Sequence, residues 1–132
     1  MGKLKLLLAE DEEDSQILFE KAVGSGKYKD NFDLTMVSNG IETVEAYKKI
    51  EPDIVVLDIL MPESTGYEAL KAIRNIEKSS NRSAVIIMLT SLQDEYYEEK
   101  AEDLWADGYI KKPINVEEIG EQIYSFYKKK NP

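Results

Sequence analysis

The 132-residue chain contains no cysteine and no histidine. The lack of cysteine excludes disulfides, thiolate metal sites and cysteine nucleophiles. The lack of histidine excludes a Ser-His-Asp triad, imidazole metal ligands and a phosphohistidine on this chain. Basic residues are also few, since 17 Lys and Arg face 26 Asp and Glu, and the net charge of −9 opposes direct nucleic-acid binding. Any metal site must therefore be built from oxygen ligands.

Long apolar runs are missing as well. The longest is far shorter than a membrane span, and residues 1–9 lead into acidic residues rather than into a signal-peptide cleavage site. We therefore expect no membrane insertion and a cytoplasmic location. Hydrophobic residues make up 42% of the chain and are spread along it, which favours a packed core. We predict one domain over residues 1–132, with no linker, repeat or output domain.

The most informative stretch is residues 52–62. Its apolar centre, Ile54 to Leu57, lacks alternation and predicts a central strand that is buried on both faces. Asp58 follows at the carboxyl end of this strand, where open α/β sheets place their ligands. Pro62 is expected to lead the chain out of the sheet. Taken alone, an Asp after a strand more often begins a turn.

Four further apolar segments predict the other strands, and they are Leu4–Ala9, Leu34–Val37, Ala84–Leu89 and Gly108–Ile110. Helical spacing follows each strand, with Asp94 opening the fourth helix and Asn115 capping the fifth. The predicted apolar stripes are Ile17, Leu18, Ala22 and Val23 in the first helix and Val116, Ile119, Ile123 and Phe126 in the last. Five βα units with short connections require right-handed crossovers. The predicted fold is α/β, a (βα)5 doubly wound parallel sheet of the flavodoxin-like kind with strand order 2-1-3-4-5.

This strand order gathers polar side chains at one edge of the sheet. The ends of strands one, three, four and five carry Glu10-Asp11, Asp58, Thr90 and Lys112. Together with Gly66 and with Tyr109, three residues before Lys112-Pro113, they resemble the receiver domain of two-component response regulators, the CheY-like superfamily. The resemblance spans nearly the whole chain.

The resemblance implies a magnesium site. By the family's pattern Asp11 and Asp58 bind Mg²⁺ directly, Glu10 binds it through water, and the backbone carbonyl of Leu60 supplies a further oxygen. The chemistry agrees, because carboxylates crowded at ~5–6 Å repel by roughly 3 kcal/mol per pair and oxygen ligands suit a hard ion. The alternative for Glu10 and Asp11 is a solvated acidic cluster at a helix start.

The resemblance also implies a phosphoacceptor in a two-component or phosphorelay system. Asp58 would be the nucleophile that becomes an aspartyl phosphate, and Lys112 would pair with the phosphoryl group. Thr90 would donate a hydrogen bond to it, and Tyr109 would then rotate from exposed to buried. The chain would thus promote its own phosphorylation and dephosphorylation without being a conventional enzyme.

Partners follow from the same resemblance. The donor would be a sensor histidine kinase, a histidine phosphotransferase or a small acyl phosphate, since this chain has no histidine. The face made by helix four, strand five and helix five would change on phosphorylation and bind a downstream protein that the sequence does not identify. A homodimer that forms on phosphorylation is a further expectation.

Other functions stay open at this point. A pseudo-receiver would use the fold only as an interaction module, although Asp58 and Lys112 are both present. A phosphatase with an aspartate nucleophile normally has a second acid two residues later, where this chain has Leu60. Taken alone, Thr90 is more often a turn or cap residue, and Tyr109 is more often packed.

Several positions depart from the family's common pattern. Glu10 replaces a frequent Asp, Thr65 stands where Asp is usual, and Trp105 stands where the glycine of Ala-Gly-Ala is typical. Trp105 is either a partner contact or a packing residue. Leu60 and Leu92 flank the expected phosphorylation pocket, and we predict that these bulky apolar side chains hinder an attacking water and prolong the life of the phosphoryl group.

Overall fold

Strands and helices alternate along the whole chain. The structure is a computed structural model that describes residues 2–61, 64–91 and 95–132. The strands are β1 (Leu4–Ala9), β2 (Phe32–Val37), β3 (Ile54–Leu57), β4 (Val85–Thr90) and β5 (Gly108–Lys111). The helices are α1 (Glu13–Val23), α2 (Gly40–Ile50), α3 (Gly66–Glu77), α4 (Glu95–Asp103) and α5 (Ile119–Lys130). All ten predicted elements are present, whereas the expectations for Pro62, Leu92 and Asp94 lie outside the described residues.

The five strands form one sheet in the order β2-β1-β3-β4-β5, and every neighbouring pair is parallel. The predicted fold class and strand order are therefore confirmed. β3 lies in the middle, where Leu57 pairs with Ala9 of β1 and with Met88 of β4. The residues that follow these three positions consequently meet at the carboxyl edge of the sheet.

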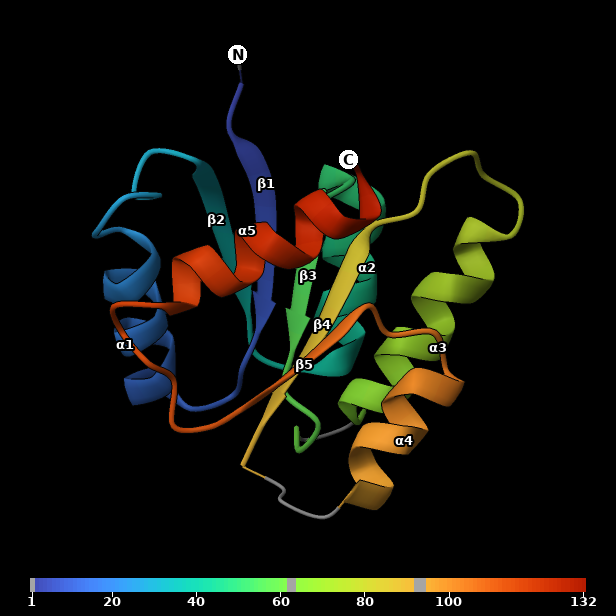
Figure 1. The fold of residues 1–132 in the computed structure, drawn as a ribbon. Helices are drawn as coiled ribbons and strands as arrows, with labels where there is room; N and C mark the ends of the chain where they lie inside the picture. The colour runs from blue at the N-terminus through green and yellow to red at the C-terminus, as the bar shows by residue number, and fades with distance from the viewer. Residues whose placement is uncertain (1, 62–63, 92–94) are drawn as a thin grey trace.

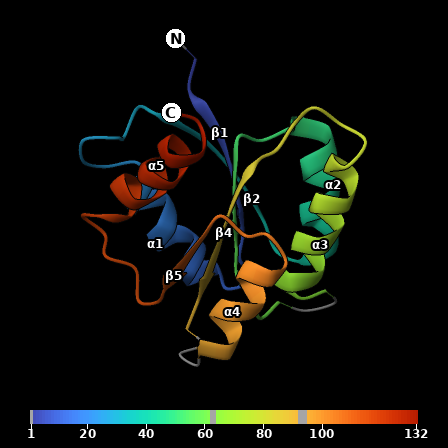
Figure 2. The same ribbon diagram turned by 45° about the vertical axis from the view of Figure 1, so that its right-hand side comes forward.

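Two layers of helices cover the sheet (Figure 1). Figure 2 shows α1 and α5 on one face and α2, α3 and α4 on the other. The side chains of β3 alternate between the faces, so that Val55 and Leu57 belong to the core under α2–α4 and Ile54 and Val56 to the core under α1 and α5. All four are fully buried, which is the two-sided burial that the apolar run predicts.

The apolar stripe of α1 differs from the predicted one. Ala22 and Val23 are buried as predicted, but Ile17 and Leu18 are 43% and 45% exposed, and Phe19 is buried against the sheet in their place. Because successive helical residues are turned by about 100°, a stripe centred on Phe19 leaves the two preceding side chains directed away from the sheet. Part of the predicted core therefore lies on the surface of α1.

The start of α5 also differs from the prediction. The side chain of Asn115 accepts hydrogen bonds from the backbone N–H groups of Glu117 and Glu118, at 3.0 and 3.2 Å, and closes a turn ahead of the helix. The helix itself begins only at Ile119, and Val116 is 42% exposed. The backbone carbonyl of Asn115 also accepts a hydrogen bond from the N–H of Ile119 at 2.9 Å, so this turn leads directly into the helix. Ile123 is buried as predicted.

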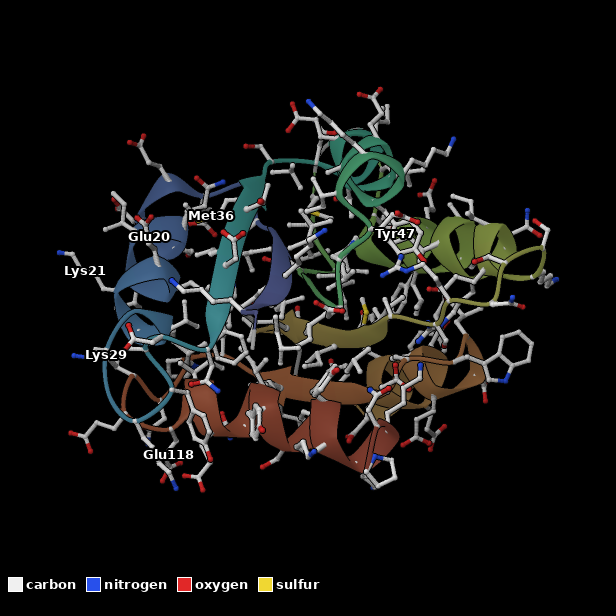
Figure 3. The ribbon with its side chains drawn as sticks, turned by 90° about the horizontal axis from the view of Figure 1, so that it is seen from above. Glu20, Lys21, Lys29, Met36, Tyr47 and Glu118 are labelled. Atoms are coloured by element: carbon white, nitrogen blue, oxygen red, sulfur yellow. The ribbon has the colours of Figure 1, made fainter. Side chains whose placement is uncertain are left out.

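The view from above in Figure 3 separates surface and core side chains. Lys21 of α1 and Lys29 of the following loop extend away from the molecule, whereas Tyr47 of α2 lies beside α3. In the described part of the chain, none of the helices combines the length and the apolar character that a bilayer crossing requires.

Candidate functional site

Three carboxylates meet at the carboxyl edge of the sheet. Glu10 and Asp11 follow β1 and Asp58 follows β3, and these two strands are paired side by side. One carboxylate oxygen from each residue lies within 4.8 Å of the others. Glu10 and Asp58 are buried, at 2% and 6% exposure, whereas Asp11 is exposed. The cluster thus has a buried wall and one side open to water.

Lys112 brings a cation to this cluster from beyond the end of β5. Its ammonium group donates hydrogen bonds to Glu10 Oε1 at 2.5 Å and to Asp58 Oδ2 at 2.9 Å. Its backbone N–H donates to the carbonyl of Thr90 at 2.8 Å, which ties it to β4. Burial acts to lower the pKa of Lys112, but the hydrogen bonds to the two carboxylates outweigh it and raise the pKa. Lys112 therefore stays an ammonium group.

The charges of this cluster do not balance. At 4.8 Å and an effective dielectric of about 20, two ionised carboxylates repel by about 3.5 kcal/mol. Burial, opposed by the hydrogen bond from Lys112, raises the pKa of Glu10 above its ordinary value. Three ionised acids and one ammonium leave two negative charges, which a divalent cation would neutralise. The donor set is made of oxygens alone, and it fits a hard ion such as Mg²⁺.

The loop after β3 fixes the position of Asp58. Asp58 Oδ1 accepts a hydrogen bond from the backbone N–H of Leu60 at 3.1 Å, and the N–H of Gly66 donates to the carbonyl of Ile59 at 2.9 Å. A Cβ atom on Gly66 would lie 2.2 Å from the carbonyl oxygen of Asp58. Only glycine fits at this close approach of two backbone segments.

Glu10 is fixed from α1. Its Oε2 accepts a hydrogen bond from the N–H of Glu12 at 3.2 Å, and its carbonyl accepts one from the side chain of Gln16 at 2.6 Å. Gln16 is not among the site residues predicted from the sequence. Its place in the first turns of a helix that directly follows the acidic residues is the signal that could have drawn attention to it.

Thr90 and Tyr109 occupy different environments. Thr90 is fully buried at the end of β4 and pairs with Lys111 in the sheet. Tyr109 lies in β5, opposite Met88, and is half-buried against the core under α4. Burial is the main cause that raises the pKa of Tyr109, and the nearby Glu98 contributes. Whether these two side chains change position together stays a prediction.

The remaining positions of interest lie around the site. Leu60 is 58% exposed at its mouth, and Leu92 lies outside the described residues, so the lifetime of a phosphoryl group stays a prediction. Thr65 now has a clear role, because its hydroxyl accepts from the N–H of Glu68 at 3.2 Å and forms a capping box at the start of α3. Trp105 is 69% exposed, which rules out packing in the core.

Comparison with known proteins gives the family. The sequence model of the response regulator receiver domain matches residues 6–124. The chain belongs to the response regulator receiver domain family. Receiver domains belong to two-component systems, interact with histidine kinases and downstream effectors, and generally use Mg²⁺.

Relatives of this receiver domain include proteins of different lengths. The chemotaxis protein CheY of Halobacterium salinarum is 40% identical over 85 residues, which are 64% of this chain and 68% of that protein. Response regulator RR06 of Streptococcus pneumoniae is 26% identical over 113 residues, which are 86% of this chain but only 48% of that regulator. The chain thus spans about half the length of the longer relative.

Solved structures agree in fold. The chemotaxis protein CheY4 of Vibrio cholerae superposes with a TM-score of 0.82 at 22% identity, covering 94% of this chain and 98% of that one. A LuxR-family DNA-binding response regulator from Staphylococcus aureus gives a TM-score of 0.78 at 28% identity, with the same two coverages. At this level of identity the CheY4 likeness concerns the fold alone.

Proposed function

We propose that Asp58 of this receiver domain accepts a phosphoryl group from a phosphohistidine of another protein. A carboxylate oxygen of Asp58 attacks phosphorus and forms a new P–O bond, while the P–N bond breaks and its electron pair returns to the imidazole. The products are an aspartyl phosphate and a free histidine. The observation that carries this proposal is the convergence of two acids and Lys112 on a buried Asp58.

The neighbouring residues take roles that follow from their places. The ammonium group of Lys112 would contact the phosphoryl oxygens, and the Thr90 hydroxyl would donate to one of them. Asp11 and Asp58 would hold Mg²⁺ directly, with Glu10 acting through water and the carbonyl of Leu60 as a further ligand. When bound, the ion neutralises charge on the transferring oxygens.

A protein donor suits the surface beside Asp58. A cavity of about 320 Å³ lies between α1 and the segment after β5, and Glu10 and Lys112 form part of its wall next to Leu18, Pro113 and Ile114. A donor that covers this mostly apolar cavity comes within reach of Asp58. We therefore propose a sensor histidine kinase or a histidine phosphotransferase as the donor, with small acyl phosphates as a substitute.

Phosphorylation would act by shifting a conformational equilibrium. The phosphoryl group would hold Thr90 in a new position, and the half-buried Tyr109 would move fully inward. The surface of α4, β5 and α5 would then bind a downstream protein or a second phosphorylated copy. The half-buried position of Tyr109 against the core supports this, because a movement inward would change how much of the side chain is exposed.

The test is phosphorylation followed by mass spectrometry of the intact protein. Acetyl phosphate and Mg²⁺ should add the mass of one phosphoryl group, and Asp58→Asn should abolish the gain. Asp53→Asn is the matched control, because Asp53 lies at the other end of the same strand and accepts a hydrogen bond from the N–H of Lys5. No gain in the wild type would favour a pseudo-receiver that binds partners without phosphorylation.

A further inference from the structure

Trp105 combines an exposed side chain with an unfavourable backbone conformation, which is hard to explain unless the residue binds a partner. It is the only tryptophan in the chain, and it is 69% exposed. Its φ of 65° lies in the left-handed region, where glycine is favoured and a side chain introduces strain. An indole on the surface at such a position stabilises neither the core nor the local backbone.

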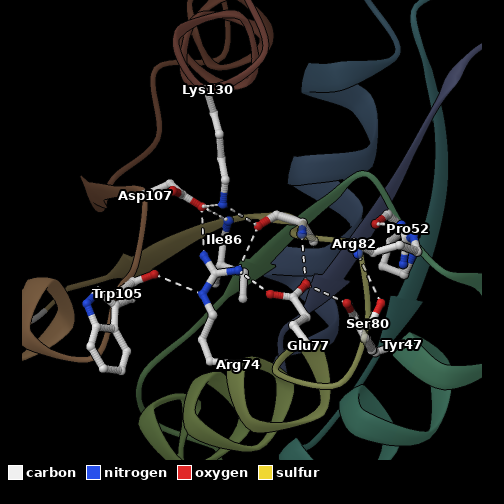
Figure 4. Close-up of polar contacts among 11 residues, drawn as sticks. Tyr47, Pro52, Arg74, Glu77, Ser80, Arg82, Ile86, Trp105, Asp107 and Lys130 are labelled. Atoms are coloured by element: carbon white, nitrogen blue, oxygen red, sulfur yellow. Dashed lines mark hydrogen bonds and ion pairs between the residues drawn. The ribbon is translucent and has the colours of Figure 1, made fainter.

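The backbone at Trp105 is held firmly in spite of this strain. Its N–H donates to the carbonyl of Glu102 at 2.9 Å, and its own carbonyl accepts a hydrogen bond from Arg74 Nε at 3.0 Å (Figure 4). Arg74 is in turn paired with Glu77 at 2.7 Å and with Asp107 at 2.8 Å. The indole is therefore presented from a rigid frame, which lowers the entropy lost when it is buried by a partner.

A groove lies beside the indole. It has a volume of about 360 Å³ and runs between α3 and the end of α4, with a wall made of Lys71, Ala72, Arg74, Asn75, Lys78, Leu104 and Trp105. Among these described lining residues there is no carboxylate. Lys71 and Lys78 are exposed, and neither takes part in an ion pair within the described part of the chain. A cationic groove is unusual on a chain with a net charge of −9.

We propose that this groove binds a short acidic peptide segment of a partner protein. An apolar side chain of the peptide would pack on Trp105, and two or three carboxylates would pair with Lys71 and Lys78. Tryptophan and arginine are enriched among the residues that carry most of the binding energy of protein interfaces, and the groove has one of each, Trp105 and Arg74. The proposal does not depend on phosphoryl transfer at Asp58.

Charge favours a short peptide over a nucleic acid. Shortly before Trp105 in the chain, α4 carries the exposed acids Glu99, Glu102 and Asp103. These acids would repel an extended phosphate backbone. A short peptide needs only to place a few charges against the α3 side of the groove. A second copy of this chain is the competing occupant, because its α4 is also acidic.

The test starts with a displayed library of random dodecapeptides selected on the wild-type protein. We expect selected peptides with Asp and Glu around an apolar residue. Because Trp105 is the sole tryptophan, their binding should shift the protein's fluorescence to the blue. The affinity of a labelled peptide, measured by anisotropy, should fall about tenfold or more in Trp105→Gly and in the double variant Lys71→Glu, Lys78→Glu.

Control variants separate the outcomes. The double variant Lys48→Glu, Lys49→Glu carries the same charge change on the last turn of α2 and should bind like the wild type. Asp58→Asn should also bind normally, so a failure of the phosphorylation proposal would not affect this result. No enriched peptide, peptides without acids, or binding that survives both groove variants would overturn the proposal. Self-association that Trp105→Gly abolishes would overturn it in favour of a second copy.

Discussion

The two edges of the sheet carry similar side chains but differ in charge balance. At the carboxyl edge Lys112 is the ion-pair partner of Glu10 and Asp58, and Asp11 adds a third acid. At the amino edge two acids, Glu77 and Asp107, face two cations, Arg74 and Lys130 (Figure 4). One edge keeps two negative charges in excess, whereas the other is neutral.

The balanced edge also satisfies its hydrogen bonds. Glu77 accepts from the Tyr47 hydroxyl at 2.5 Å and from the N–H of Ala84 at 2.8 Å. Asp107 accepts from the N–H of Ile86 at 2.9 Å and from Lys130 at 3.0 Å. These contacts join α2, α3, α5 and the segments that enter β4 and β5. The network therefore holds five parts of the fold together.

The difference teaches where this fold carries its function. Where each charge has a partner, the polar groups stabilise the packing of helices on the sheet. Where acids are in excess, folding brings like charges close together. The free energy of such a cluster then depends on whether a cation or a transferred group is bound to it. Removal of one acid should therefore change stability in opposite directions at the two edges. Four sets of measurements test the difference between the edges.

Loss of Arg74 should give the largest effect. Arg74→Met removes the cation that pairs with Glu77 and Asp107, so that the buried Glu77 loses its ion-pair partner and the half-buried Asp107 keeps only Lys130. We expect the free energy of unfolding in urea to fall by about 3–4 kcal/mol, with a melting temperature lower by roughly 10 °C. Lys71→Met, one turn earlier on α3, should change stability by less than about 0.5 kcal/mol. Equal effects of the two variants would contradict a structural role for the balanced edge.

Magnesium should stabilise the carboxyl edge and no other part. If the ion binds with millimolar affinity, ~10 mM Mg²⁺ should raise the free energy of unfolding by roughly 1–1.5 kcal/mol. Asp11→Asn removes one of the three clustered carboxylates and should reduce this gain to below about 0.5 kcal/mol. Arg74→Met should keep the full gain, because the two edges are independent sites. A gain retained in Asp11→Asn would place the ion elsewhere.

A single charge removed at each edge should change stability with opposite sign. In metal-free buffer Asp58→Asn relieves its repulsion with Glu10 while Lys112 keeps Glu10 as a partner, so we expect a gain of about 1 kcal/mol. Asp107→Asn loses its attraction to Arg74 and Lys130 and should lower stability by about 2 kcal/mol. Urea unfolding of both variants gives the signs, and losses of equal size would show that the edges do not differ.

The carboxyl edge was largely predictable from the sequence because its residues follow strands. The unbroken apolar run Ile54–Leu57 identified the central strand, and the strand order then determined that Glu10, Asp58 and Lys112 come together. In a parallel sheet the residue after each strand lies at the same edge. Short-range pattern was sufficient there, since each residue's place depends only on where its own strand ends.

The amino edge could not be predicted in the same way. Arg74 and Lys130 read as ordinary surface charges on helices, and their partner Asp107 lies 33 and 23 residues away from them. Helical spacing likewise did not decide that Phe19 rather than Leu18 faces the sheet, because several apolar stripes fit the same α1 sequence. The left-handed backbone of Trp105 was signalled only by the family's pattern, because Trp105 stands where that pattern has a glycine.

The smallest effect should come from Trp105, whose carbonyl is bound by Arg74 of the balanced edge. Trp105→Gly removes the side-chain strain at φ 65°, while the more flexible unfolded chain offsets part of the benefit, so we expect a gain of about 0.5–1 kcal/mol in urea unfolding. Trp105→Ala keeps a Cβ in the left-handed region and should give no gain. If both variants lose stability, the indole contributes to the fold, and its exposure must then be explained by local packing rather than by a partner.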